Sequence, residues 1–412
     1  MKIIHPVLFW IFSLSSLSIN AQQIDTSKKA ALPIDDSSKI QAVHAQKDLL
    51  EIIGEYIHPK KVSTKDPEKA QFSAVPAAGY AMHTGWAGLV TANLAFYTSK
   101  NYSTDKKVSS IATNITYSQY KQLMLPVQAN IWTNKNKFNI LLDWRYIKYP
   151  SKVFDLGSDS KESSGYLVDY HGIKLHQTAL KSFAPNFYAG LGFYYDRLWN
   201  INEVDPPANS VTSFQSYGFQ KTVTASGPVL KLLYDSRLNT INPQNGLQAN
   251  ITYRPSIKTF GSDNNWQSLQ LEFRKYLHPS SNSKNILALW SHNWVTLGGK
   301  PPYLMLPSTG WDDTYNSGRG YLQGRYRARN MIYLESEYRF QISSNGLIGG
   351  VVFVNGQTFS EHISRGYQGF IPGYGLGLRI KLNKYSGANV CIDYGFGRDG
   401  SRGFAVNLGE LF

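Results

Sequence analysis

The feature that most constrains the fold is an alternation of apolar and polar residues that returns along most of the chain. Segment 138–147 (FNILLDWRYI) carries apolar side chains at every second position and mostly polar or charged ones between them, and segments 247–254 and 269–274 repeat this pattern. Successive side chains of a β-strand point to opposite faces, so each segment predicts a strand with one apolar and one polar face. A soluble sandwich also alternates in this way. The apolar faces here end repeatedly in Trp, Tyr or Phe, which is typical of the aromatic girdles of a transmembrane β-barrel.

The N-terminus carries the pattern of an export signal. The first two residues supply a positive region, residues 7–19 an apolar core, and Ile19-Asn20-Ala21 a plausible cleavage site before Gln22. An uncleaved anchor would need a longer apolar stretch, and no run of ~18 apolar residues follows residue 21, which excludes a helical membrane protein. We therefore expect a cleavable signal peptide over 1–21 and export across an inner membrane.

Residues 22–70 are polar and rich in lysine, and they predict one amphipathic helix over 37–57. Its signals are a serine cap, apolar residues at helical spacing and a terminating His-Pro pair: Ser37 or Ser38, then Ile40, Val43, Leu50, Ile53 and Ile57, then His58-Pro59. Such a helix could lie on a membrane, plug a pore or dock a partner. A weakly ordered lead-in to the rest of the chain is the alternative, so this segment is expected to be periplasmic or lumenal.

From residue 71 onward, segments with strand character recur to the end of the chain. The candidate strands are 71–84, 86–98, 108–119, 121–132, 138–149, 164–180, 186–200, 222–235, 246–260, 265–278, 284–298, 327–342, 346–357, 369–382, 388–396 and 401–412. An even number of strands is what single-chain bacterial barrels require. The longest gap without strand character is 299–326. The sequence thus predicts an all-β chain, with a transmembrane antiparallel β-barrel of about 16 strands over 71–412.

Composition and motifs argue against chemistry at a catalytic site. One cysteine, Cys391, excludes an internal disulfide framework and a cysteine-rich metal site. Gly395–Gly400 formally matches a dinucleotide fingerprint, but a further alternating segment follows it, so Asp399-Gly400 is better interpreted as a hairpin turn. The net charge of +14 is scattered, which favours anionic lipid headgroups or an electropositive lumen over nucleic acid. We expect no enzyme activity, no cofactor and no metal.

Four stretches, in order and in register, resemble the BamA/TamA-like outer-membrane assembly and translocation barrels, also called the bacterial surface antigen family. They are the opening hairpin 76–80 with 84–86, a mid-barrel turn at 234–246 with the pattern D-x-R-x-x-x-x-x-P-x-x-G, the SGRGY sequence at 317–321, and the strand 333–339. In this chain the lettered positions of the mid-barrel turn pattern are Asp235, Arg237, Pro243 and Gly246. The chain also ends in an alternating segment that resembles the C-terminal recognition strand of bacterial outer-membrane barrels, with Phe404, Leu408 and Phe412 on one face.

The resemblance implies that the arginine of the loop motif reaches back into the lumen and is held by acidic residues on the wall. The loop residues are Arg319, Gly320 and Tyr321, and the wall residues are Glu335, Glu337 and Asn355. Glutamates inside a narrow lumen need partners, and arginine offers a planar fork for two hydrogen bonds. Glu337 matches the family's acidic position best. Asn355 stands where the family usually has aspartate, and its amide is expected to accept from the guanidinium.

The function that the resemblance implies is assembly or translocation of outer-membrane proteins through a seam. The first and last strands, about 71–84 and 401–412, would pair weakly and part, and Gly79, Gly403 and Gly409 lower strand propensity there. Residues 22–70 offer no room for a periplasmic polypeptide-transport-associated (POTRA) domain. The expected partners are lipids of the Gram-negative outer membrane, and nascent outer-membrane proteins or a partner that bears periplasmic domains.

Two other classes of function stay open. The chain could be a passive or gated transport channel whose polar lumen is lined by Asp143, Arg145, Glu272 and Arg274. It could also be a structural subunit of a surface complex.

Overall fold

The computed structural model describes residues 46–49, 51–52, 70–98, 107–133, 135–208, 210–237, 239–280, 283–362, 367–384 and 387–412. The expected signal peptide lies outside these residues, as does most of the lead-in. Of the predicted helix 37–57, only 46–49 and 51–52 are described, and Leu49, Glu51 and Ile52 are helical.

The described chain is built almost entirely from antiparallel strands. They are β1 (Gln71–Ala81), β2 (Gly85–Phe96), β3 (Ser109–Ser118), β4 (Leu123–Thr133), β5 (Phe138–Lys148), β6 (Ser151–Val153), β7 (Tyr166–Ala184), β8 (Phe187–Val204), β9 (Thr222–Asp235), β10 (Gly246–Ser256), β11 (Trp266–Leu277), β12 (Ile286–Gly299), β13 (Asn330–Gln341), β14 (Ile348–Ser360), β15 (Gln368–Lys381), β16 (Asn389–Gly397) and β17 (Arg402–Leu408). Short helices interrupt the connections: η1 (Glu162–Ser164), α3 (Ser213–Gly218), η2 (Lys258–Phe260), η3 (Tyr303–Met305) and η5 (Arg398–Gly400). No helix among the described residues has the length and hydropathy that a membrane crossing requires.

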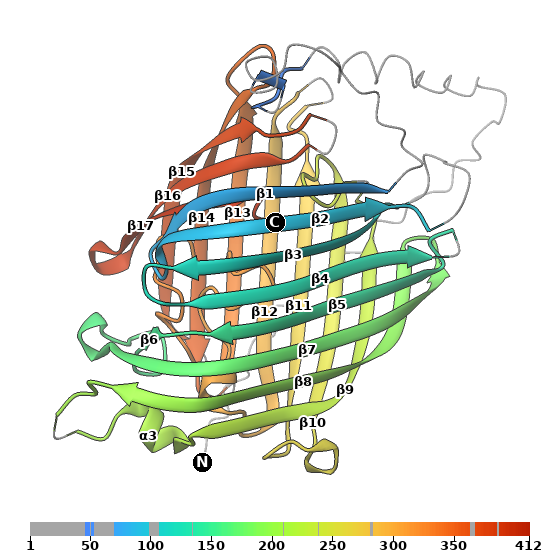
Figure 1. The fold of residues 1–412 in the computed structure, drawn as a ribbon. Coiled ribbons are helices and arrows are strands. Elements are labelled where there is room, and N and C mark those ends of the chain that lie inside the picture. Colours follow the sequence, from blue (N-terminus) through green and yellow to red (C-terminus); the bar gives the residue numbers. More distant parts are fainter. Residues whose placement is uncertain are drawn as a thin grey trace, which may run out of the picture. The chain divides into compact units, whose positions relative to one another are not determined.

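The strands form a nearly closed barrel of 16 wall strands, which confirms the predicted fold class (Figure 1). β5 and β6 count as one wall strand because both pair with β7, and Tyr149 between them continues the ladder through its N–H to the carbonyl of Tyr170 at 2.8 Å. Each wall strand pairs with its neighbour in sequence. The predicted last strand, 401–412, is present as β17 but ends early: β17 stops at Leu408, and the last four residues leave the wall.

Burial in this barrel is the reverse of burial in a soluble protein. On β13, Leu334 is 53% exposed while its neighbours Glu335 and Glu337 are 5% and 0% exposed. Along the other strands, apolar side chains such as Leu191 and Val354 also lie on the outer face. An outer surface of this kind is stable only against hydrocarbon, because alternating strands of a transmembrane barrel point apolar residues to lipid and polar residues to the lumen.

The two ends of the barrel carry connections of different length. One end, which we call the loop end, carries the longest connections, 205–221 and 300–329. The opposite end, which we call the turn end, carries short ones such as 185–186 and 342–347. Outer-membrane barrels have short periplasmic turns and longer extracellular loops. In a barrel that follows this rule, the turn end, where β1 begins and β17 ends here, is the periplasmic one.

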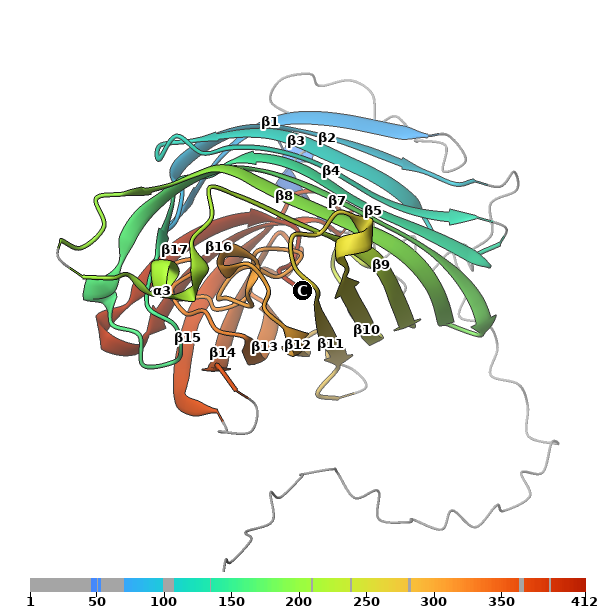
Figure 2. The same cartoon turned by 90° about the horizontal axis from the view of Figure 1, so that it is seen from below.

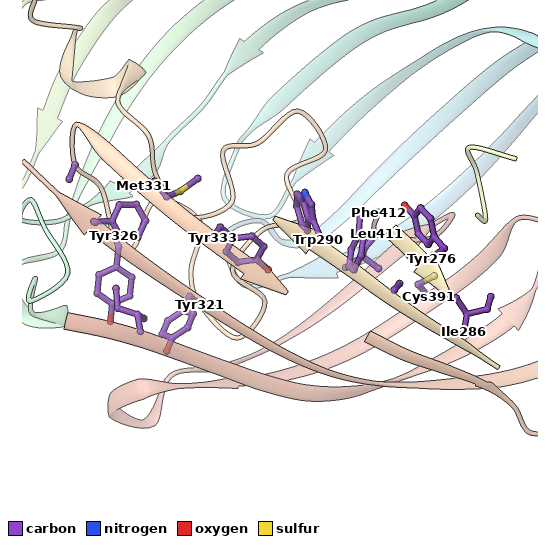
Figure 3. Packing of buried hydrophobic residues seen from close by; sticks show 14 residues of the cluster. Tyr276, Ile286, Trp290, Tyr321, Tyr326, Met331, Tyr333, Cys391, Leu411 and Phe412 are labelled. Atoms are coloured by element: carbon purple, nitrogen blue, oxygen red, sulfur yellow. The ribbon is translucent and has the colours of Figure 1, made fainter. Parts of the chain in front are cut away.

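The interior of the barrel is occupied by protein. Figure 2 shows the segment between β12 and β13, residues 300–329, folded inside the curved sheet, with the C-terminus in the same space. Figure 3 shows a buried cluster that joins this loop to the wall and to the C-terminus: Tyr276, Trp290, Tyr321, Tyr326, Tyr333, Leu411 and Phe412 among others. The lumen is thus packed around loop 300–329 as a core.

Candidate functional site

The tip of loop 300–329 reaches the inner wall of the barrel at Arg319. Glycines flank it on both sides, and their positive φ angles (+76° at Gly318, +96° at Gly320) favour residues without a side chain. A Cβ at Gly320 would lie only 2.7 Å from the carbonyl oxygen of Phe396 on β16. The two glycines therefore let the loop backbone lie directly against the backbone of the wall.

Three carboxylates hold the Arg319 guanidinium. Nη1 donates to Asp393 Oδ2 at 2.9 Å, and Nη2 donates to Glu337 Oε1 at 2.5 Å and to Glu335. The guanidinium also lies 3.5 Å from the centre of the Phe353 ring. Burial disfavours the charged form, but the three carboxylates outweigh burial and raise the pKa of Arg319 above its usual range. Arg319 is therefore a fixed cation inside the barrel.

Further charged groups extend this contact into one buried network, which we call the lumen charge cluster. Its members are Arg319, Arg339, Arg379, Glu335, Glu337, Asp393 and Glu410. Glu337 is central, since Oε2 accepts from Arg339 at 2.7 Å while Oε1 lies 3.7 Å from Arg379. Arg379 also donates to Asp393 at 2.6 Å. Buried charges of both signs in contact satisfy one another, but removing one leaves its partners unpaired.

The expected contact of Arg319 with Glu335 and Glu337 is present, and Asn355 also lies at Arg319, although it binds the backbone of Arg319 and not its guanidinium. The Asn355 Nδ2 group donates to the backbone carbonyl of Arg319 at 3.1 Å, and its side chain does not accept from the guanidinium. The third acceptor is Asp393 on β16, which the sequence analysis missed. Only the alternation of β16 signals it, because this places Cys391, Asp393 and Gly395 on one face; nothing local shows that the loop tip reaches that strand.

Tyr321 fastens the other side of the loop tip. Its hydroxyl donates to the carbonyl of Pro372 on β15 and accepts from the backbone N–H of Arg398 at 2.6 Å. The ring packs beside Gly397, where a Cβ would lie 2.5 Å from ring atoms. Arg319 therefore binds carboxylates of the wall, Gly320 lies against its backbone, and the Tyr321 ring packs on the surface over Gly397.

A methyl group at Gly395 should displace the loop tip. A Cβ at Gly395 would lie 2.6 Å from the backbone nitrogen of Gly320, and backbone atoms cannot move aside as a flexible side chain does. We expect Gly395→Ala to cost about 1–3 kcal/mol through overpacking and to increase protease cleavage within 300–329. Gly88→Ala is the matched control, because a Cβ there meets nothing within 4 Å. Equal protease sensitivity of the two variants would contradict the close approach.

The residues of the D-x-R turn lie at the turn end, between β9 and β10. Asp235 accepts from the backbone N–H of Arg237 at 3.0 Å and from its Nε and Nη2 at 3.1 Å each. Pro243 is buried, and Gly246 has a φ of +95° with the carbonyl oxygen of Ser236 2.9 Å from its Cβ position. These four residues hold a compact turn, and they lie apart from the loop tip.

The junction between β1 and β17, which we call the seam, differs from every other junction of the wall. Among the described residues, each other neighbouring pair of wall strands forms a ladder, whereas none joins β1 to β17. The two strands are nevertheless adjacent: a Cβ at Gly79 would lie 3.9 Å from that of Val406, and the Tyr80 and Phe404 rings are 6.1 Å apart. Side chains touch across the seam without the backbone pairing that holds the rest of the barrel.

The remaining predicted residues fall into two groups. Phe404 and Leu408 belong to β17, but Phe412 is buried in the lumen, where its ring lies 5.1 Å from that of Trp290. The lumenal charges pair with one another, Arg145 with Asp143 and Arg274 with Glu272, each at 2.6 Å. Within the described ranges, no group of three or more His, Cys, Asp or Glu residues could hold a metal ion.

Comparisons with known proteins agree with this geometry. A model described as the Omp85 superfamily domain matches residues 106–412. The barrel is similar to BamA from Haemophilus ducreyi lacking POTRA domains 1–3, with a TM-score of 0.54 and 15% identity over 90% of this chain and 81% of that chain. CdiB from Acinetobacter baumannii has a TM-score of 0.53 and 15% identity, over 83% of this chain and 60% of that chain. CdiB from Escherichia coli has a TM-score of 0.53 and 9% identity, over 84% of this chain and 63% of that chain. No curated protein sequence matches the chain. At these identities the structures establish a common fold.

Proposed function

Because this chain belongs to the Omp85 superfamily and forms an outer-membrane β-barrel, we propose that it assembles or translocates other outer-membrane proteins through the seam between β1 and β17. The mechanism is one of strand pairing, with no bond made or broken. An extended segment of the client pairs with a free strand edge, and the weakly held seam parts to admit it.

The observation that carries this proposal is the missing ladder at the seam. A strand edge presents a row of unpaired N–H and C=O groups, which is a ready template for another strand. β1 has 11 residues and β17 only 7, so β17 is too short to cover the edge of β1. Outside the seam, every strand edge in the described wall is taken by a neighbour. A client strand can therefore pair at the seam with the smallest cost in free energy, because no existing ladder has to be broken there.

Client proteins and a partner that bears periplasmic domains are the partners we propose. The turn end faces the periplasm, from which exported chains arrive, and the free part of β1 begins there. Lipids surround the outer face, where exposed apolar side chains meet the hydrocarbon.

A disulfide across the seam tests the proposal. In Gly79→Cys/Val406→Cys the two Cβ atoms would be 3.9 Å apart, within the ~3.5–4.5 Å that a disulfide requires. We expect the oxidised protein, reconstituted in lipid vesicles, to lose its ability to fold a small reporter barrel, and reductant to restore it. Folding of the reporter is measured by its compact mobility on unheated gels.

The control is a disulfide within an ordinary ladder. Ala112→Cys/Gln128→Cys joins facing residues of β3 and β4, which are already paired, so its oxidation should leave activity unchanged. The single variants keep buried Cys391 and report any background cross-linking. Full activity of the oxidised seam pair would overturn the proposal.

A transport channel is the second candidate, because a cavity with charged side chains in its lining remains between loop 300–329 and the wall. Arg145, Lys174, Asp196, Arg254 and His292 are among its lining residues. Single-channel conductance separates the two functions. A steady open pore would favour the channel, whereas low and flickering conductance that Arg319→Ala raises would favour a plugged assembly barrel.

A further inference from the structure

We propose that the lumen contains a binding site for a small uncharged molecule that carries one aromatic ring and one hydroxyl group. The site is the cavity between loop 300–329 and the wall that His292 lines, and we call it the His292 site. None of its lining residues belongs to the seam, to the loop tip at Arg319 or to the lumen charge cluster. The inference therefore goes beyond the proposed function, and it holds whichever of the two candidate functions the barrel performs.

The size and the lining of the cavity fit one aromatic ring. Its volume is about 120 Å³, which is close to the ~150 Å³ of an apolar protein cavity that binds benzene. Leu304, Met305 and Trp311 line it from the loop, and Ile147 and Trp294 line it from the wall. Aromatic rings pack favourably against side chains of both kinds, aromatic and aliphatic. A single ring can therefore fill this space.

His292 on β12 presents an unused hydrogen-bonding group to the cavity. The residue is 6% exposed, and neither Nδ1 nor Nε2 has a hydrogen-bond partner among the described residues. The other imidazole of the lining, that of His176, is bonded to Asp196 at 2.8 Å. A buried polar group without a partner costs free energy. The partner of His292 is therefore to be sought in whatever fills the cavity.

The wall residues that face His292 direct their polar atoms elsewhere. Glu272 faces it on β11, and Glu272 Oε1 accepts from Arg274 Nε at 2.9 Å and from Nη2 at 2.6 Å. Tyr333 faces it on β13, and the hydroxyl of Tyr333 donates to Glu335. The imidazole is thus left for the cavity.

The cationic side chains of the lining already have carboxylate partners. Arg145 and Lys174 share the carboxylate of Asp143, at 2.6 Å and 3.0 Å. Arg254 pairs with Asp196 at 2.5 Å. A ligand with a net charge would either break one of these pairs or add a buried charge without a counterion, and both are costly. The lining therefore favours an uncharged ligand.

Asp312, a buried carboxylate of the lining, is satisfied by the loop itself. Its Oδ1 accepts from the N–H of Thr314 at 2.9 Å, and its Oδ2 accepts from that of Ser317 at 2.7 Å. The imidazole of His292 is the group left for a ligand, and in its neutral form it has one donor and one acceptor. A hydroxyl can donate and accept, and on an aromatic ring it leaves the rest of the molecule apolar. These requirements together describe a phenol.

A ligand in the His292 site contacts both the loop and the wall. Its ring lies among side chains of the loop such as Trp311, while its hydroxyl binds His292 on the wall. A loop that has left the wall has lost half of the site, so binding favours the docked loop by mass action. The ligand is thus a second contact that fixes loop 300–329, separate from the contact at Arg319.

The test uses para-fluorophenol as the probe and fluorine NMR of the purified protein in detergent micelles, with protein-free micelles as the blank. His292→Phe keeps a ring at this position but removes both hydrogen-bonding nitrogens. We expect this variant to bind para-fluorophenol about tenfold more weakly than the wild type. Para-fluorotoluene, which lacks the hydroxyl, should bind the two proteins with equal affinity.

His171→Phe is the matched control, because His171 is bonded to Tyr146 and does not line the cavity. It should leave the affinity for para-fluorophenol unchanged. Met305→Trp fills the cavity from the loop and should abolish binding of both probes, so it carries the test if His292→Phe does not reach the compact gel form. Para-fluorobenzoate and para-fluorobenzylammonium, which are charged, should bind about tenfold more weakly than para-fluorophenol or worse.

Proteolysis of loop 300–329 supplies a second readout. At a para-fluorophenol concentration about ten times its dissociation constant, cleavage that requires the loop to leave the wall should slow about elevenfold in the wild type. In His292→Phe the same concentration should slow it only about twofold. Three results would overturn the proposal: binding no stronger than in the blank, equal affinity of the wild type and His292→Phe for para-fluorophenol, or tighter binding of a charged analogue. Cleavage that the bound probe does not slow would overturn the contact between loop and wall.

Discussion

Replacing Arg319 with alanine should free loop 300–329 from the wall and lower the temperature at which the barrel loses its compact gel mobility. The substitution leaves Glu335, Glu337 and Asp393 without the cation that contacts all three. Removal of one partner of a buried charged pair costs about 3–5 kcal/mol, and this loss falls on the contact that fixes the tip of the loop to the wall. Proteolysis of the loop and heat modifiability on gels measure the two effects.

Arg325→Ala is the matched control for this prediction. Arg325 lies on the same loop and is equally buried, but it donates to the carbonyl and hydroxyl of Ser160, so its removal leaves no carboxylate unpaired. Its effect should be clearly smaller. Arg319→Lys should fall between the two, because an ammonium keeps the charge but lacks the planar fork that reaches several carboxylates. A loop that stays protected in Arg319→Ala would contradict the lock.

Glu337→Gln should have the second largest effect on the barrel. Glu337 is fully buried and interacts with three guanidinium groups, those of Arg319, Arg339 and Arg379. The amide keeps one acceptor oxygen but removes the negative charge, so we expect a loss smaller than that of Arg319→Ala. The double variant should be clearly less than additive, because both changes break the same contact. Thermal loss of compact mobility in the four proteins of this cycle measures the coupling.

Glu335→Gln is the companion of this variant on the same strand. Glu335 accepts hydrogen bonds from Arg319 and from the hydroxyl of Tyr333. When the charge of Glu335 is removed, Arg319 still contacts the carboxylates of Glu337 and Asp393. Its effect should therefore be the smaller of the two. Fully additive losses in Arg319→Ala/Glu337→Gln, or a larger loss in Glu335→Gln than in Glu337→Gln, would show that the cluster is organised differently.

Much of the wall was predictable because each strand repeats a local rule. Segment 138–147 shows its two faces in ten residues, and β5 occupies that place. The inward position of Glu335 and Glu337 follows from the same parity on β13. The loop arginine was found by resemblance, since a glycine on each side of Arg319 is a weak signal by itself. Asp393 was missed because a partner on a strand more than seventy residues away depends on how the loop folds back.

The C-terminus shows where local reasoning fails. Residues 402–408 and 409–412 continue one alternating pattern, and the pattern predicts one strand to the end of the chain. The structure ends β17 at Leu408, because Gly409 permits a left-handed turn and the lumen offers Glu410 two arginines and Phe412 a tryptophan. A strand alternation records which side chains could share a face, and it carries no information about a competing site elsewhere in the fold.

The sequence by itself determined the number and order of the wall strands and the face of each that meets lipid. These follow from alternation, which depends only on neighbours along the chain. The tertiary structure alone decided that β1 and β17 meet without a ladder, that Asp393 completes the arginine site, and that the last four residues leave the wall. Each of these depends on free energies of contact between segments far apart in the chain, where pairing of buried charges and ring stacking outweigh local strand propensity.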